Sequence, residues 1–138
     1  MTRIGLSVIS LALSLSGGAA AADVVAVVSS KSAVAALSRD QVAEIFLGKT
    51  SRFPDGTAAV PIDLTEGAAE RDEFYKKVAS KTSAQIKAYW SKIIFTGRGQ
   101  PPKIVSNGIE MKKYIAANPA TIGYLDSKLV DDSVRVLR

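Results

Sequence analysis

The chain alternates short β-branched runs with segments whose apolar residues recur at helical spacing, and this alternation constrains the fold most. Val24–Val28 is a continuous apolar run followed by polar residues, which is typical of a strand buried on both faces. A helix is expected next, because Ser38 and Gln41 have the spacing of a capping box and Gly48 ends the apolar pattern. The same order, strand and then helix, recurs along the chain.

Later segments extend this pattern to a complete α/β domain. Further strands are expected over residues 58–63, 103–105, 121–125 and 134–137. Further helices are expected over 70–79, between Thr82 and Gly97, and between Asn107 and Asn118. Pro61 requires either an edge strand or a position where no ladder hydrogen bond is needed. The predicted fold is a three-layer sandwich with a mainly parallel sheet and helices on both faces.

Residues 1–22 have the composition of a signal peptide. Arg3 precedes an apolar stretch over 4–15, and small residues over 17–22 precede Asp23. The alternative, a retained membrane anchor, is disfavoured because about a dozen apolar residues are fewer than the roughly 20 that span a bilayer. We therefore expect an exported, periplasmic protein with one domain over residues 23–138 and no membrane insertion of the mature chain.

The composition excludes several classes of function. The sequence has no cysteine and no histidine, so it lacks disulfides, the commonest general base and the commonest transition-metal ligand. A formal net charge of +5 favours anions without the basic footprint of a nucleic-acid-binding protein. We expect no metal site, no cofactor, no catalytic residue and no nucleic-acid partner. The enzymatic alternative would use Asp63 and Glu66 as paired carboxylates.

Three segments are candidates for binding an oxyanion. A turn between a strand and a helix N-terminus offers unpaired N–H groups and a partial positive charge. The first candidate is the serine-rich turn after the first strand, and the second is the turn over residues 65–71. The third is a glycine-flanked arginine after a helix. The candidate ligands are Ser29, Ser30, Ser32, Gly67, Ala68, Arg71 and Arg98.

Each candidate also has a purely structural interpretation. The serine hydroxyls can instead bond their own backbone, as such residues do in turns. Arg98 follows a helix C-terminus, where a cation satisfies the last carbonyl groups. Arg71 can form an ion pair with a neighbouring acid instead of binding an anion, and those acids would also repel a dianion. The acids concerned are Glu66, Glu70, Asp72 and Glu73.

Two distant segments resemble the phosphate-type substrate-binding proteins of ABC transporters, which have the type 2 periplasmic binding fold. Residues 37–49 resemble the family's helix that leads to a Phe-x-Gly-Lys element, and residues 118–125 resemble its Asn-Pro-x-x-Ile-Gly-Tyr strand entry. The turn over 65–71 resembles the family's phosphate-binding turn at Gly67 and Arg71. It departs from that turn because Ala68 and Ala69 occupy positions where hydroxyl-bearing residues are expected.

The resemblance implies one lobe of such a receptor, since the chain is much shorter than the two-lobe proteins. It implies a periplasmic solute-binding-like protein that recognises phosphate or a similar oxyanion and is linked to ABC-type phosphate uptake. A transporter permease or a second copy would then close the open side of the site. The alternative is an exported protein-binding or scaffolding module that kept the fold and lost the ligand.

Overall fold

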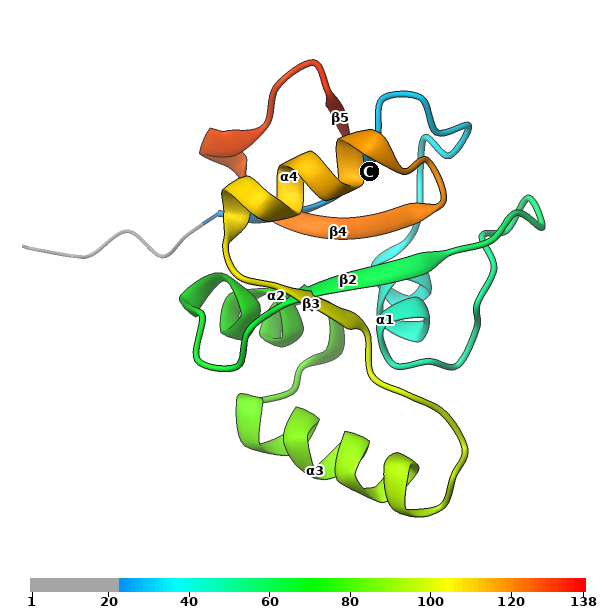
Figure 1. Ribbon diagram of the computed structural model, residues 1–138, viewed down its shortest axis with the longest axis vertical. Helices are drawn as coiled ribbons and strands as arrows, with labels where there is room; N and C mark the ends of the chain where they lie inside the picture. Colours follow the sequence, from blue (N-terminus) through cyan, green and yellow to red (C-terminus); the bar gives the residue numbers. More distant parts are fainter. Residues whose placement is uncertain (1–22) are drawn as a thin grey trace, which may run out of the picture.

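A computed structural model describes residues 23–138 of the protein (Figure 1). The predicted signal peptide, residues 1–22, lies outside the described residues. No helix within 23–138 has the length and apolar character needed to cross a bilayer. The elements are β1 (Val24–Ser29), α1 (Arg39–Phe46), β2 (Val60–Leu64), α2 (Ala69–Ala79), α3 (Ser83–Phe95), β3 (Lys103–Val105), α4 (Gly108–Ala117), β4 (Thr121–Asp126), a 3-10 turn (Ser127–Leu129) and β5 (Val134–Val136).

The predicted helix starts are confirmed by their capping hydrogen bonds. The side chain of Ser38 accepts from the backbone N–H of Gln41, and the Gln41 side chain accepts from the N–H of Ser38. Thr82 and Gln85 form the same reciprocal pair at α3. These local bonds satisfy N–H groups that a helix leaves unpaired in its first turn.

The sheet is mixed, and the predicted α/β fold class is confirmed: β2, β3, β4 and β5 run in one direction and only β1 runs in the other. The strand order is β3-β2-β4-β1-β5. β2 runs parallel to β3 and β4, whereas β1 runs antiparallel to both β4 and β5. Alternation of strands and helices predicts the α/β class, but it does not determine which strands become neighbours. Here β4 lies between β1 and β2, and β1 enters the sheet in the opposite direction.

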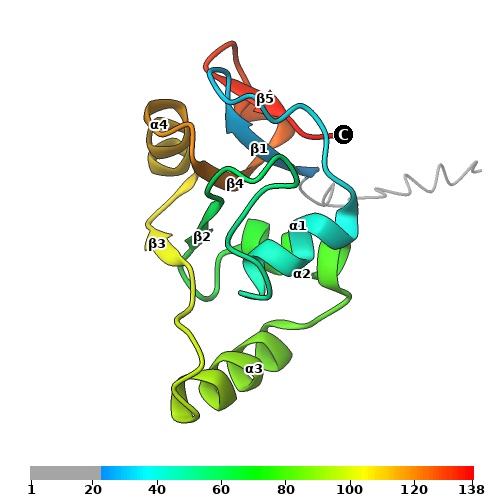
Figure 2. The same ribbon diagram turned by 90° about the vertical axis from the view of Figure 1, so that its right-hand side faces the viewer.

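The helices cover both faces of the sheet, as predicted. Figures 1 and 2 show α4 on one face and α1 with α2 on the other, which makes three layers. In both views α3 lies below these layers, beyond α2 and next to the end of α1. Trp90 joins α3 to the domain, because its ring lies against Gly48 at the end of α1.

Pro61 lies in an interior strand, at a position that needs no ladder hydrogen bond. β2 pairs with β4 at Val60 and Pro61, but its pairing with β3 begins only at Ile62. The N–H of Val60 donates to Ala120, just before β4, so the neighbouring Pro61 nitrogen faces the β3 side. No described strand pairs with Pro61 on that side, which explains how proline is tolerated in an interior strand.

An aromatic cluster fills the core between the sheet and the helices α1 and α2. Phe74 of α2 stacks on Tyr124 of β4 with ring centroids 4.1 Å apart. Phe46 of α1 meets Phe74 edge-on at 4.7 Å. These rings and Tyr75 are buried, and such pairs stabilise the core beyond the burial of their area.

Gly123 provides a test of the packing between β4 and α4. A methyl group on Gly123 would lie 2.6 Å from the sulfur of Met111 and 2.9 Å from Ile115. We expect Gly123→Ala to lower the free energy of unfolding by about 1–3 kcal/mol, because both neighbours are buried in a packed core. Urea denaturation measures the loss. Gly99→Ala is the control, since its nearest neighbour would be at 3.6 Å; equal losses for the two variants would contradict the predicted clash.

Candidate functional site

The structure does not bring the three candidate segments together. β2 and β4 are parallel and β1 is antiparallel to β4, so the C-terminal ends of β1 and β2 lie at opposite ends of the sheet. The serine turn after Ser29 is therefore far from the turn that follows Leu64. Arg98 lies in a third place, after the end of α3. The seven candidate ligands cannot surround one anion in a single copy of this chain.

The serine turn is held by bonds within the protein. The Ser29 hydroxyl donates to the carbonyl of Ala116 and accepts from the N–H of Lys31. The Ser32 hydroxyl accepts from the N–H of Val34. Arg135 of β5 donates to the carbonyl groups of residues 30, 32 and 34. Only the exposed Ser30 hydroxyl has no bond to another described residue, so the turn offers little to an anion.

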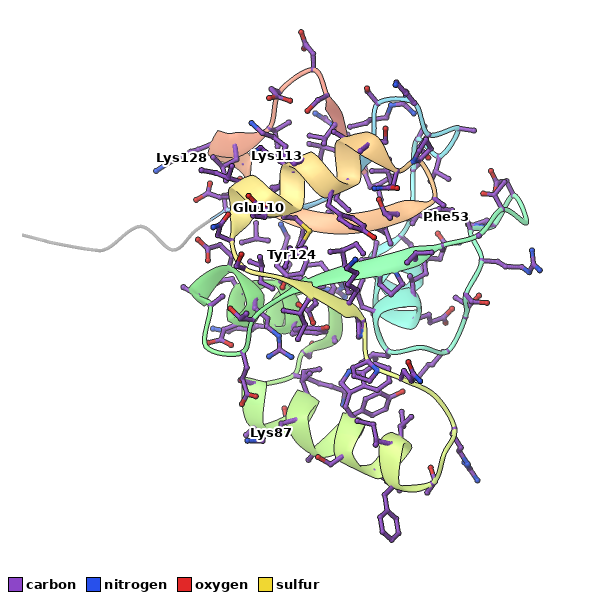
Figure 3. The ribbon with its side chains drawn as sticks, viewed as in Figure 1. Phe53, Lys87, Glu110, Lys113, Tyr124 and Lys128 are labelled. Atoms are coloured by element: carbon purple, nitrogen blue, oxygen red, sulfur yellow. The ribbon has the colours of Figure 1, made fainter. Side chains whose placement is uncertain are left out.

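A buried carboxylate at the end of β2 organises the second segment. Asp63 accepts from the hydroxyl of Tyr75 at 2.6 Å and from the N–H of Leu64 at 2.8 Å. The hydroxyl of Tyr124 donates to Oδ1 of Asp63, the oxygen that also accepts from Leu64, whereas Tyr75 donates to Oδ2. Tyr124 lies in the interior between β4 and β2 (Figure 3). The cluster therefore ties β2, α2 and β4 together at one point.

The environment of Asp63 keeps both tyrosines protonated. Burial raises the pKa of the Tyr75 and Tyr124 hydroxyls far above the ordinary range, and the negative charge of Asp63 adds to the shift. Both hydroxyls therefore remain hydrogen-bond donors at neutral pH. Three donors around one carboxylate satisfy a charge that would otherwise be costly to bury.

Arg71 completes the cluster through Nε, and the terminal nitrogens of its guanidinium group remain open to another partner. Its Nε lies 3.4 Å from Asp63, and its guanidinium lies 5.2 Å from the centre of the Tyr75 ring. Asp63 is not one of the acids that the sequence suggested as a partner. The two terminal nitrogens of Arg71 form no bond with any residue that the structure describes. The side chain remains 11% exposed, so an anion can reach them.

The turn before α2 leaves the N–H groups of the first helical turn without a side-chain cap. Gly67 has φ of +94°, a left-handed conformation that favours glycine, and it lets the chain turn into the helix. Ala68 is the N-cap residue and has no side-chain oxygen to accept from the helix. The N–H groups of Ala69, Glu70 and Arg71 therefore remain available to water or to an anion.

Acidic side chains flank this helix start. Glu66 is exposed and lies 3.7 Å from Lys87 of α3, whereas Asp63 is enclosed by its donors. Glu70 and Asp72 lie in the first turn of α2. The enzymatic alternative would require Asp63 and Glu66 to act together, but they have different partners. Within residues 23–138 no group of three histidine, cysteine, aspartate or glutamate side chains is placed to hold a metal ion.

The sequence interpretation missed the partnership of Asp63 with Tyr75 and Tyr124. The available signal was an aspartate inside an otherwise apolar strand, which indicates a buried carboxylate that must be satisfied. Its partners could not be identified, because Tyr124 is 61 residues away in the sequence.

Comparison with solved structures identifies the fold. A Clostridium perfringens chain named as a putative phosphate ABC transporter substrate-binding protein, solved with bound phosphate, superposes with a TM-score of 0.65 and 22% identity. The match covers 83% of this chain and 44% of that one. An ABC-type phosphate transport receptor of Vibrio cholerae superposes with a TM-score of 0.63 at 17% identity, covering 83% of this chain and 45% of that one. PstS of Borrelia burgdorferi superposes with a TM-score of 0.60 at 12% identity, and the match covers 83% of this chain and 46% of that one.

These matches show the fold of this chain and how much of each solved chain it corresponds to. The chain spans less than half the length of these solved chains. No protein-family model matches the sequence, and no curated protein shows significant sequence similarity to it. The protein therefore has an α/β fold that matches one lobe of periplasmic binding protein structures.

Proposed function

We propose that this protein is a periplasmic, solute-binding-like protein that recognises phosphate or a similar oxyanion at the N-terminus of α2. The observation that carries this proposal is that Arg71 uses only Nε within the protein. Asp63 holds Nε, which leaves the terminal nitrogens of the guanidinium open beside a helix turn without a side-chain cap. Arginine and helix N–H groups both donate charge-assisted hydrogen bonds to oxyanions. The role is binding rather than catalysis, with no cofactor.

The structural comparison supports a link to ABC-type phosphate uptake. One of the solved chains that share this fold holds phosphate, and a second is a phosphate transport receptor. A single lobe leaves much of a bound anion in water, where each polar interaction is weak. We therefore propose that a transporter permease or a second copy covers the open side. Export through a cleavable signal peptide, residues 1–22, would place the protein with such partners.

A scaffolding or protein-binding role is the second candidate, and the composition of the turn favours it. Ala68 and Ala69 contribute no hydroxyl groups, and Glu66 and Glu70 would repel an anion. An exported module that kept this fold and lost its ligand would have no measurable affinity for phosphate.

A calorimetric titration with phosphate separates the two candidates. We expect saturable heat with phosphate and none with chloride, with sulfate as a test of selectivity. Arg71→Ala should weaken binding about tenfold or more, because it removes a charge-assisted donor. Ala69→Pro should weaken binding by removing one N–H donor, while the fold remains intact because proline is tolerated at the first position of a helix.

A matched variant makes this test specific. Ser83→Pro introduces the same change at the first residue of α3 and should leave phosphate binding unchanged. Glu70→Gln should strengthen binding, because it removes a like charge from the first turn of α2. The absence of heat up to millimolar phosphate would exclude the oxyanion-binding role for this chain and favour the scaffolding role.

A further inference from the structure

A groove of about 820 Å³ lies between α3 and the rest of the domain. None of its lining residues belongs to α2 or to the turn that precedes it, so it is separate from the phosphate site proposed above. Its volume falls within the range of about 300–1,000 Å³ that is typical of small-molecule sites. The groove also includes the part of β2 at Pro61 that β3 leaves uncovered.

Part of the groove lining is apolar. Ile45 and Leu47, from the end of α1, line the groove together with Trp90 and Ile93 of α3. The side chain of Tyr89 fixes α3 against the domain, because its hydroxyl donates to the carbonyl of Leu47 at 2.7 Å. This surface can hold the apolar part of a ligand.

The groove lining also carries positive charge. Lys92 and Arg98 line the groove, and neither forms an ion pair with any residue in the described part of the chain. No acidic residue is among those that line the groove. The surrounding segment has the same sign of charge, since residues 74–109 contain seven basic side chains and no acidic one. A ligand that enters this groove is therefore selected for negative charge.

Trp90 provides independent evidence that a ligand acceptor is missing from the groove. Its side chain is nearly buried, and its indole N–H has no acceptor among the described residues. It is the one buried side-chain polar atom of residues 23–138 without a hydrogen-bond partner. Buried donors are almost always paired, so an unpaired donor on a groove residue indicates an acceptor that the chain does not supply.

We propose that this groove binds an amphiphilic organic anion. Arg98, Lys92 and the indole N–H of Trp90 donate to the acidic head group, and the apolar part lies against Leu47 and Ile93. Arg98, which the sequence indicated as an anion ligand, thus serves a site of its own. An acidic head group joined to an apolar chain occurs both in free organic acids and in anionic lipids, and the test below distinguishes the two sources.

Trp90 makes the proposal directly measurable, because it is the only tryptophan in the chain. The full chain is titrated with laurate below its critical micelle concentration while tryptophan emission is recorded. We expect a saturable change in emission with laurate, and none with acetate or with the cationic dodecyltrimethylammonium. Arg98→Ala and Lys92→Ala should each weaken laurate binding about fivefold or more, because each removes a charge-assisted donor.

Lys87→Ala is the matched control. Lys87 is an exposed cation on the same helix (Figure 3), but it does not line the groove. Its loss should leave laurate affinity unchanged. The proposal is overturned if laurate gives no saturable change, if the cationic detergent binds equally well, or if Lys87→Ala weakens binding as much as Arg98→Ala.

Two further measurements distinguish the groove from the phosphate site and from a membrane-binding surface. Saturating phosphate should not displace laurate, so laurate binding without phosphate binding would refute only the function proposed above. Phosphate binding without laurate binding would refute only the groove. Sedimentation with phosphatidylglycerol vesicles tests the lipid source, and binding to vesicles without binding to monomeric laurate would replace the groove with a membrane-surface interaction.

Discussion

Replacing Asp63 with alanine should lower the free energy of unfolding by about 3–5 kcal/mol, which is the range for breaking a buried charged pair. The reason lies in what the substitution leaves behind. The hydroxyls of Tyr75 and Tyr124 would lose their acceptor, and the largely buried Arg71 would lose its counter-charge. Each buried polar group without a partner costs the full desolvation of that group. Urea denaturation followed by circular dichroism measures the loss.

Two other variants test whether the cluster causes this loss. Tyr75→Phe removes one donor and leaves the carboxylate otherwise satisfied, so its cost should be closer to about 1 kcal/mol. Asp132→Ala removes an exposed carboxylate that makes no hydrogen bond within residues 23–138, and should stay within about 0.5 kcal/mol of the wild type. A loss below about 1 kcal/mol for Asp63→Ala would mean that the cluster contributes little to stability.

Alkaline pH should destabilise the protein through the same two tyrosines. The folded state raises the pKa of both hydroxyls, through burial first and the charge of Asp63 second, whereas in the unfolded chain they titrate near pH 10. Their contribution to stability is therefore present in full below about pH 10 and is lost as the pH rises above it. The loss per tyrosine is about 1.4 kcal/mol per pH unit, or about 2–3 kcal/mol for both at pH 11.

The midpoint of urea denaturation between pH 8 and pH 11 checks this dependence. A variant with both Tyr75→Phe and Tyr124→Phe should start from lower stability, because the buried carboxylate loses two donors. Its stability should then fall less steeply above pH 10, since neither hydroxyl remains to titrate. Identical slopes for the variant and the wild type would show that other groups control unfolding at high pH.

Local features of the chain could be predicted from the sequence because their causes are local. The capping box of Ser38 and Gln41 needs only two residues three positions apart, and the strand at Lys103–Val105 was predicted with the observed bounds. The direction of β1 could not be predicted, because it depends on pairing with β4, nearly one hundred residues later. Periodicity shows that a segment is a strand but not which strand lies beside it.

The candidate site shows the same limit. The helix start after Gly67 was recognisable from the residue types alone, and the structure leaves its first turn without a side-chain cap. The partner of Arg71 was sought among the acids next to it in sequence. The structure instead pairs it with Asp63, one strand end earlier and buried. Burial, and not proximity in sequence, determined which carboxylate became the partner.

The pairing of β1 with β5 has a mechanical consequence. The two strands are antiparallel, and the last backbone bond of the pair joins Leu137 to Ala26, so Asp23 and Arg138 lie at the same end of the sheet. A force that pulls these two residues apart acts across the strands, along the direction of the hydrogen bonds between them. The bonds then carry the load one after another rather than together. Tension applied through these ends would peel β5 from the sheet before it disturbs the core beneath α2.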